Sequence, residues 1–103
     1  MTKTIAIIGA GPTGLATAAH AIERGLTPGV FERGPAVGHA VRQWAHVPMF
    51  SPWAYNFDAA AARLLAGSGW TPPPRSAYPT GGDLLMRYLI PLAGLPGLGQ
   101  ALR

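Results

Sequence analysis

Three glycines near the start of the chain, Gly9, Gly11 and Gly14, follow the spacing Gly-x-Gly-x-x-Gly. A glycine turn lets the backbone approach a ligand closely, and the amides that open a helix attract phosphate groups. Glu32 lies roughly 20 residues further on, where an acid can accept hydrogen bonds from ribose hydroxyls. These residue types would suit a dinucleotide, with its pyrophosphate on the glycines and its adenosine ribose on the acid. The spacing alone is a weak signal in a chain with 14 glycines, so its meaning depends on the surrounding elements.

The apolar pattern of the first 32 residues predicts the elements that hold these glycines. Residues 4–8 form a short β-branched run that stops at a glycine, which indicates a parallel strand buried on both faces. Residues 12–24 carry apolar residues at helical spacing, with Pro12 at the first helical position and Gly25 at the stop. Residues 29–32 then predict a second strand ending in the acid, which favours FAD or NAD over NADP. The competing interpretation is an ordinary strand–helix turn, with Glu32 as a solvated charge.

The rest of the chain has a weaker pattern. Residues 35–57 are aromatic-rich, lack a clear period and predict a loop with isolated turns of helix, whereas residues 58–66 predict an alanine-rich helix capped by Asp58 or Asn56. Thr80 and Asp83 have the spacing of a capping box and predict a third helix, which Pro91 should end or kink. The tail, residues 92–103, contains no recognisable strand. The sequence therefore predicts an α/β fold: a partial Rossmann-like FAD/NAD(P)-binding domain over 1–103, with a βαβ unit over 1–34 and loops and two helices over 35–103.

Composition excludes several other classes. A chain of 103 residues with 49% hydrophobic and 12% charged residues forms at most one domain and cannot be a complete multidomain enzyme. It has no cysteine, so thiol chemistry and disulfides are excluded, and its three histidines show no metal-binding pattern. The net charge of +4 comes from scattered cations, which argues against nucleic-acid binding. No run of about 18 apolar residues predicts a membrane span, and the glycine loop interrupts any signal-peptide core. A cytoplasmic location fits these features.

The motifs resemble a known family. The three glycines, followed by Ala18, Gly25 and the pair Glu32-Arg33, are similar to the extended N-terminal fingerprint of FAD-dependent oxidoreductases with two dinucleotide-binding domains. Further motifs resemble the flavin-containing monooxygenase branch of that family, namely Val37-Gly38, Arg42-Gln43-Trp44, Phe50-Ser51-Pro52-Trp53 and Tyr78-Pro79-Thr80-Gly81. The branch with a redox cysteine pair, typified by glutathione reductase, is ruled out because this chain has no cysteine.

The resemblance implies a set of cofactor-binding residues. FAD is the expected cofactor and NAD the alternative. The pyrophosphate would lie on the glycine loop, Glu32 would bind the ribose, and Arg33 would border the adenine. Arg42 is a further candidate that could equally be a surface arginine. The complete set of expected binding residues is Gly9, Gly11, Pro12, Thr13, Gly14, Glu32, Arg33 and Arg42.

No catalytic residue can be assigned from the sequence. Trp44, Trp53 and Tyr55 could lie near a flavin, although small domains more often use such aromatics in the core. His39 and His46 are not expected to be catalytic. By the resemblance, the chain would be the FAD-binding N-terminal part of a flavin-dependent oxidoreductase or monooxygenase and would not turn over alone, since the family's second glycine fingerprint is missing.

Two other interpretations of the function remain open. One is a non-catalytic dinucleotide-binding module that works with a partner chain supplying the rest of an enzyme. The other is a fragment of an NAD-dependent dehydrogenase. The monooxygenase-like interpretation predicts exposed apolar surface on the strand edges, because two parallel strands are too few for a stable sheet.

Overall fold

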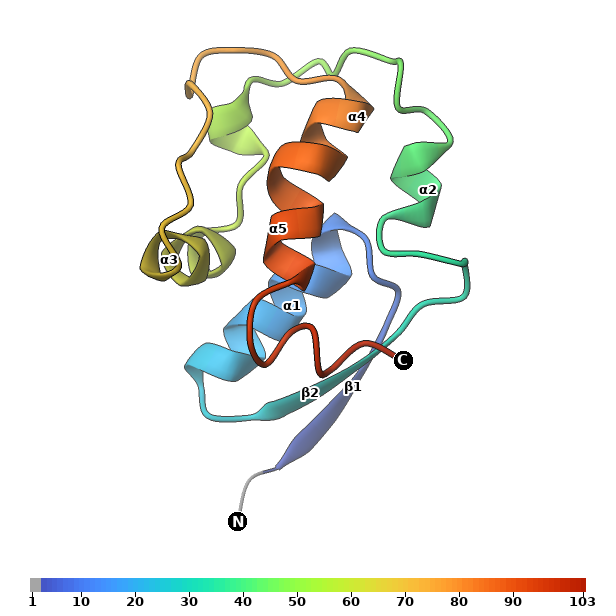
Figure 1. Ribbon diagram of the computed structural model, residues 1–103, viewed down its shortest axis with the longest axis vertical. Helices are drawn as coiled ribbons and strands as arrows, with labels where there is room; N and C mark the ends of the chain where they lie inside the picture. The colour runs from blue at the N-terminus through green and yellow to red at the C-terminus, as the bar shows by residue number, and fades with distance from the viewer. Residues whose placement is uncertain (1–2) are drawn as a thin grey trace.

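The computed structural model describes residues 3–103, so the first two residues of the predicted unit over 1–34 lie outside the description. Strand β1 (Thr4–Ile8), helix α1 (Pro12–Glu23) and strand β2 (Thr27–Phe31) follow one another. The two strands pair in parallel, from Thr4 opposite Thr27 to Ile8 opposite Phe31. Helix α1 lies along one side of the pair (Figure 1). The predicted order of strand, helix and strand is confirmed.

Strand β2 begins two residues earlier than the sequence predicts and includes Pro28 and Gly29. Thr27 donates its N–H to the carbonyl of Lys3 on the β1 side, whereas Val30 donates on the opposite side, to Ala101. In a strand, the backbone nitrogens of successive residues point to opposite edges. The nitrogen of Pro28 therefore faces the same edge as that of Val30. The missing donor of Pro28 therefore costs no hydrogen bond to β1, and a proline is tolerated at this position.

The tail contains no strand, as predicted, yet its last residues pair with β2. Val30 N–H donates to the carbonyl of Ala101 at 2.9 Å, and Arg103 N–H donates to the carbonyl of Val30 at 2.8 Å. Leu102 thereby forms a parallel bridge with Val30. The C-terminus runs beside β2 (Figure 1). A short third segment thus pairs with the edge of β2 that faces away from β1.

The prediction that the first strand is buried on both faces is wrong. Among the five residues of β1, only Ile7 is buried, and its register partner Val30 is fully buried beside it. On the other face of the pair, Ile8 is 83% exposed and Phe31 is 46% exposed. Strand side chains alternate between faces, so α1 can cover only one of them. The exposed apolar surface lies on a face of the strand pair, whereas the prediction placed it at the strand edges. We call Ile8 and Phe31 the open face.

The regular elements after β2 are all helical and are joined by loops. They are α2 (His39–Arg42), a 3₁₀ turn η1 (Trp53–Tyr55), α3 (Ala59–Gly67), α4 (Gly81–Leu84), a π-helical stretch η2 (Leu85–Leu89) and α5 (Ile90–Ala93). Helix α3 begins one residue after the predicted start, and Asp58 caps it by accepting a hydrogen bond from Ala61 N–H at 2.9 Å. Helix α2, only four residues long, and η1 are isolated helical turns of the kind predicted for the aromatic-rich stretch.

The predicted capping box is confirmed, but the helix does not end at Pro91. Thr80 and Asp83 exchange two hydrogen bonds, each 3.0 Å long, and start α4 as predicted. From α4 through η2 to α5 the backbone stays helical and continues two residues beyond Pro91 (Figure 1). Of the two effects predicted for Pro91, an end to the helix is therefore wrong, while the helix is irregular at the π turn just before this residue. Pro91 sits in the first turn of α5 after the wider π turn, where a missing N–H is tolerated.

An aromatic cluster anchors the core. Trp53 stacks on Phe57 with ring centroids 5.2 Å apart, and Phe57 also contacts Trp70 and Tyr88, each at 5.3 Å. Trp53 is 2% exposed, whereas Tyr55 is 80% exposed. Of these two aromatics, Trp53 serves the core and Tyr55 faces solvent. No helix within residues 3–103 is both long and apolar enough to cross a bilayer.

Candidate dinucleotide-binding site

Glycine occupies each of the three motif positions for a different structural reason. Gly9 has φ of +99°, a conformation that side chains rarely adopt, and its N–H donates to the carbonyl of Phe31 at 2.7 Å. A Cβ on Gly14 would overlap the carbonyl oxygen of Gly9, so only glycine lets α1 pack this closely on the loop. A Cβ on Gly11, in contrast, would meet nothing within 4 Å. The space in front of Gly11 is therefore open to a ligand.

Helix α1 starts in this loop without a side-chain cap. Gly11 is the N-cap residue in an extended conformation, and Pro12 occupies the first turn. Leu15 N–H donates to the carbonyl of Gly11 at 3.0 Å. The first N–H groups of a helix have no partner within it, and the helix dipole adds positive potential there. This end of α1 can attract an anion without a cationic side chain.

A hollow of about 540 Å³ lies at this end of α1. It is large enough for part of a nucleotide, since small-molecule pockets usually measure about 300–1,000 Å³. Two of its lining residues, Arg33 and His39, carry basic side chains. The full lining consists of Gly9, Gly11, Pro12, Glu32, Arg33, Gly34, Pro35, Gly38, His39, Ala40 and Val41.

The carboxylate of Glu32 joins two backbone segments at the edge of the hollow. Its Oε1 accepts a hydrogen bond from Ala10 N–H at 2.8 Å, and its Oε2 accepts one from Gly34 N–H at 2.6 Å. The bonds from Ala10 and Gly34, and to a smaller extent the charge of His39, hold the pKa of Glu32 below its ordinary value. Glu32 is thus an ionised acceptor at the edge of the hollow.

The structure brings five of the eight predicted binding residues together around the hollow: Gly9, Gly11, Pro12, Glu32 and Arg33. Gly14 supports the loop from behind. Thr13 lines a different hollow, together with His20 and Asp58. The exposed Arg42 uses its Nε to donate to the carbonyl of Val37 at 3.2 Å and does not line the hollow.

The sequence reasoning missed the second wall of the hollow. His39 lines it, and a Cβ on Gly34 would overlap the His39 ring, so the ring lies directly against that glycine. Gly38 has φ of +67°, and its N–H donates to the carbonyl of Ala10 at 2.9 Å. The glycines at 34 and 38 were the available signal, because a tight turn beside the acid brings α2 back onto the loop.

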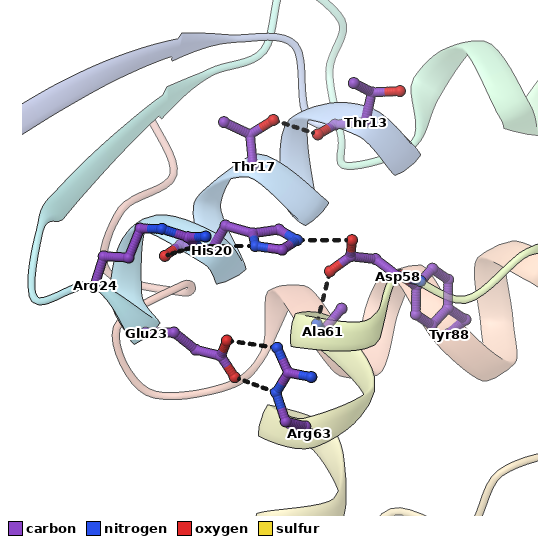
Figure 2. Close-up of polar contacts among 9 residues, drawn as sticks. All are labelled: Thr13, Thr17, His20, Glu23, Arg24, Asp58, Ala61, Arg63 and Tyr88. Atoms are coloured by element: carbon purple, nitrogen blue, oxygen red, sulfur yellow. Dashed lines mark hydrogen bonds and ion pairs between the residues drawn. The ribbon is translucent and has the colours of Figure 1, made fainter.

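A second polar cluster fastens α1 to α3 (Figure 2). Arg24 donates to Nδ1 of His20 at 3.0 Å, so Nε2 of His20 is the atom that donates to Asp58, at 2.9 Å. One helical turn away, Arg63 forms two 2.8 Å bonds with Glu23. His20 pairs with a helix cap, and within residues 3–103 no group of three or more acidic, histidine or cysteine residues could hold a metal.

A parallel βαβ unit, a glycine turn at the helix start and an acid at the end of the second strand define a Rossmann-like dinucleotide-binding fold. Residues 4–75, more than half of the chain, match the model of the FAD dependent oxidoreductase family. The chain therefore belongs to that family, whose cofactor is FAD. No curated protein matches the sequence closely enough to be counted.

Solved monooxygenases share the fold. A steroid monooxygenase bound to NADP has 22% identity over 98% of this chain, with a TM-score of 0.70. OTEMO in complex with FAD and NADP has 20% identity over 99% of the chain, with a TM-score of 0.66. Cyclohexanone monooxygenase has 22% identity over the whole chain, with a TM-score of 0.65. This chain spans only 18–19% of the length of those proteins.

Proposed function

We propose that this chain is the FAD-binding N-terminal part of a flavin-dependent oxidoreductase of the monooxygenase type. The observation that carries the proposal is the open hollow at the start of α1, bordered by Gly11 on one side and Glu32 on the other. Family membership and the fold shared with monooxygenases support it. In this proposal residues 1–103 form one incomplete FAD/NAD(P)-binding domain, with its βαβ unit over 1–34.

The chain's own residues would bind and orient the cofactor, and bound FAD would supply the redox chemistry. The amides of Gly11, Thr13 and Gly14 would hold the pyrophosphate, with Gly9 and Pro12 shaping the turn and Thr13 adding a hydroxyl. Glu32 would accept bonds from the adenosine ribose, and Arg33 would border the adenine. Arg42, whose Nε donates to the carbonyl of Val37, would reach the cofactor from outside the hollow.

Catalysis by these residues alone is not part of the proposal. The open face, with Ile8 and Phe31 exposed, gives the second candidate its support: a module that binds the dinucleotide and works with further polypeptide that covers this face. The two candidates share the cofactor site and differ only in what catalyses the reaction. A third candidate is an NAD-dependent dehydrogenase fragment, because Glu32 would serve the adenosine ribose of NAD as well as that of FAD. This candidate predicts that the chain prefers NAD.

The test is a calorimetric titration of the purified chain with FAD and with NAD. We expect saturable binding of FAD in preference to NAD. Gly11→Val places a side chain in the open space before the loop, where a Cβ meets nothing within 4 Å. The fold should therefore survive while FAD affinity falls at least about tenfold.

Gly67→Val is the matched control, because a Cβ on Gly67 also meets nothing within 4 Å and the residue lies in α3, outside the hollow. FAD affinity should be unchanged in this variant. Equal affinity in wild type and Gly11→Val would remove the pyrophosphate site from the glycine loop. Preference for NAD would favour the dehydrogenase candidate instead.

A further inference from the structure

The carboxylate of Glu32 is already engaged in the ligand-free protein. Each of its oxygens accepts one backbone N–H, from Ala10 on one side and Gly34 on the other. Ala10 is the residue between the first two motif glycines and is completely buried. A ribose-binding acid needs only to reach the ligand, so these two bonds require a different explanation.

Both backbone groups of Ala10 are held by the segment that follows β2. Its N–H donates to Glu32, and its carbonyl accepts from Gly38 N–H at 2.9 Å. The preceding N–H, of Gly9, donates to the carbonyl of Phe31. The loop between β1 and α1 is therefore tied to residues 31–38 at consecutive positions, and Glu32 is the only side chain among these contacts within residues 3–103.

We propose that Glu32 is a positioning residue for the glycine loop, whose carboxylate holds Ala10 and Gly34 so that the Gly11 backbone faces the pyrophosphate before the cofactor arrives. The inference rests on the proposed function. An ionised carboxylate has about four acceptor positions, so two remain for ribose hydroxyls. Pre-ordering the loop lowers the entropy that binding must overcome. Glu32 then acts on the pyrophosphate end of the ligand as well as on the ribose.

Changing the ligand and the residue together distinguishes a positioning role of Glu32 from a role in ribose binding alone. The probes are ADP and 2′,3′-dideoxyadenosine diphosphate, which lacks both ribose hydroxyls. Glu32→Gln replaces one carboxylate oxygen by an NH₂ group that cannot accept from a backbone N–H. We expect Glu32→Gln to lower the affinity for the dideoxy compound at least about tenfold, since hydrogen bonds to charged groups are stronger than those between neutral groups. Unchanged affinity for that compound would overturn the proposal.

A second readout needs no ligand. In an NMR pH titration, the amide signals of Ala10 and Gly34 should shift together, with one midpoint at the lowered pKa of Glu32. The other charged groups around Glu32 are His39 and Arg33, which line the same hollow, and Arg103, which lines the adjoining one. The common transition should vanish in Glu32→Gln. Two amides that fail to follow the Glu32 carboxyl would contradict the proposal.

Asp83→Asn is the matched control, because Asp83 also accepts a backbone N–H, from Thr80 at 3.0 Å, in the capping box of α4. It should alter the Thr80 amide and leave Ala10, Gly34 and ADP binding unchanged. If the wild-type chain binds neither FAD nor ADP, the proposed function fails, while the amide titration still decides whether Glu32 holds the loop.

Discussion

The βαβ unit and the helical segment behind it are stabilised in different ways. Strand β1 buries one side chain, and its glycine loop is held by backbone hydrogen bonds and by the Glu32 carboxylate. The helical segment instead buries large side chains, with Trp53, Tyr88 and Leu89 each at most 2% exposed. The comparison indicates that the candidate binding site depends on backbone geometry, and the stability of the chain depends on apolar packing.

Helix α1 connects the two regions. Its Leu15, Ala18 and Ala19 are fully buried, and the bonds from His20 to Asp58 and from Arg63 to Glu23 fasten it to α3 (Figure 2). The glycine loop is therefore mounted on a helix that the core holds firmly. Changes in one region should affect stability, and changes in the other should affect binding.

The largest expected effect is in the aromatic core. Trp53→Ala should lower the free energy of unfolding by about 3–5 kcal/mol, because it removes a large buried side chain and leaves a cavity beside Phe57. Tyr55→Ala, two residues away and exposed, should change it by less than about 0.5 kcal/mol. Denaturant unfolding measures both. Similar losses in the two variants would contradict the separation of core from surface.

A smaller contrast is expected within β1. Ile7→Ala should lower the free energy of unfolding by about 2–5 kcal/mol, because Ile7 is buried against α1. Ile8→Ala, on the open face, should cost less than about 0.5 kcal/mol and should reduce self-association. Denaturant unfolding and light scattering provide the two measurements. An equally large loss at Ile8 would mean that something covers the open face in solution.

The smallest effects are the pH dependences, which should have opposite signs in the two regions. Glu32 has a lowered pKa. Its contribution to the free energy of unfolding is therefore present above the ordinary pKa of glutamate and is lost as the pH falls through the lowered pKa. Burial raises the pKa of Tyr88. Its contribution to the free energy of unfolding is therefore present below the ordinary pKa of tyrosine and is lost as the pH rises through the raised pKa. Unfolding measured across pH should show an acid arm that Glu32→Gln flattens and an alkaline arm that Tyr88→Phe flattens. Arms that persist in both variants would assign them to other groups.

The sequence was most informative where local backbone chemistry decides the structure. The glycine turn, Pro12 at the helix start, the cap at Asp58 and the box at Thr80 and Asp83 all depend on residues within a few positions of each other. Each of these features is present in the structure. The family resemblance followed from the same short motifs.

The wrong predictions share a physical reason, which is that burial and pairing depend on distant residues. An apolar run such as residues 4–8 looks the same whether one or both of its faces are covered. The bridge between Leu102 and Val30, which the sequence did not predict, joins the C-terminal end of the chain to β2. A pairing between residues so far apart in the chain leaves no local signal.

The sequence by itself thus determined the strand–helix–strand order and the glycines and acid of the candidate site, because these are requirements of the local backbone. Only the tertiary structure decided which of the eight predicted residues meet around one hollow, that His39 forms its second wall, and that Glu32 binds Ala10 and Gly34. Those contacts depend on how residues 34–38 fold back onto the loop, which no spacing along the chain specifies.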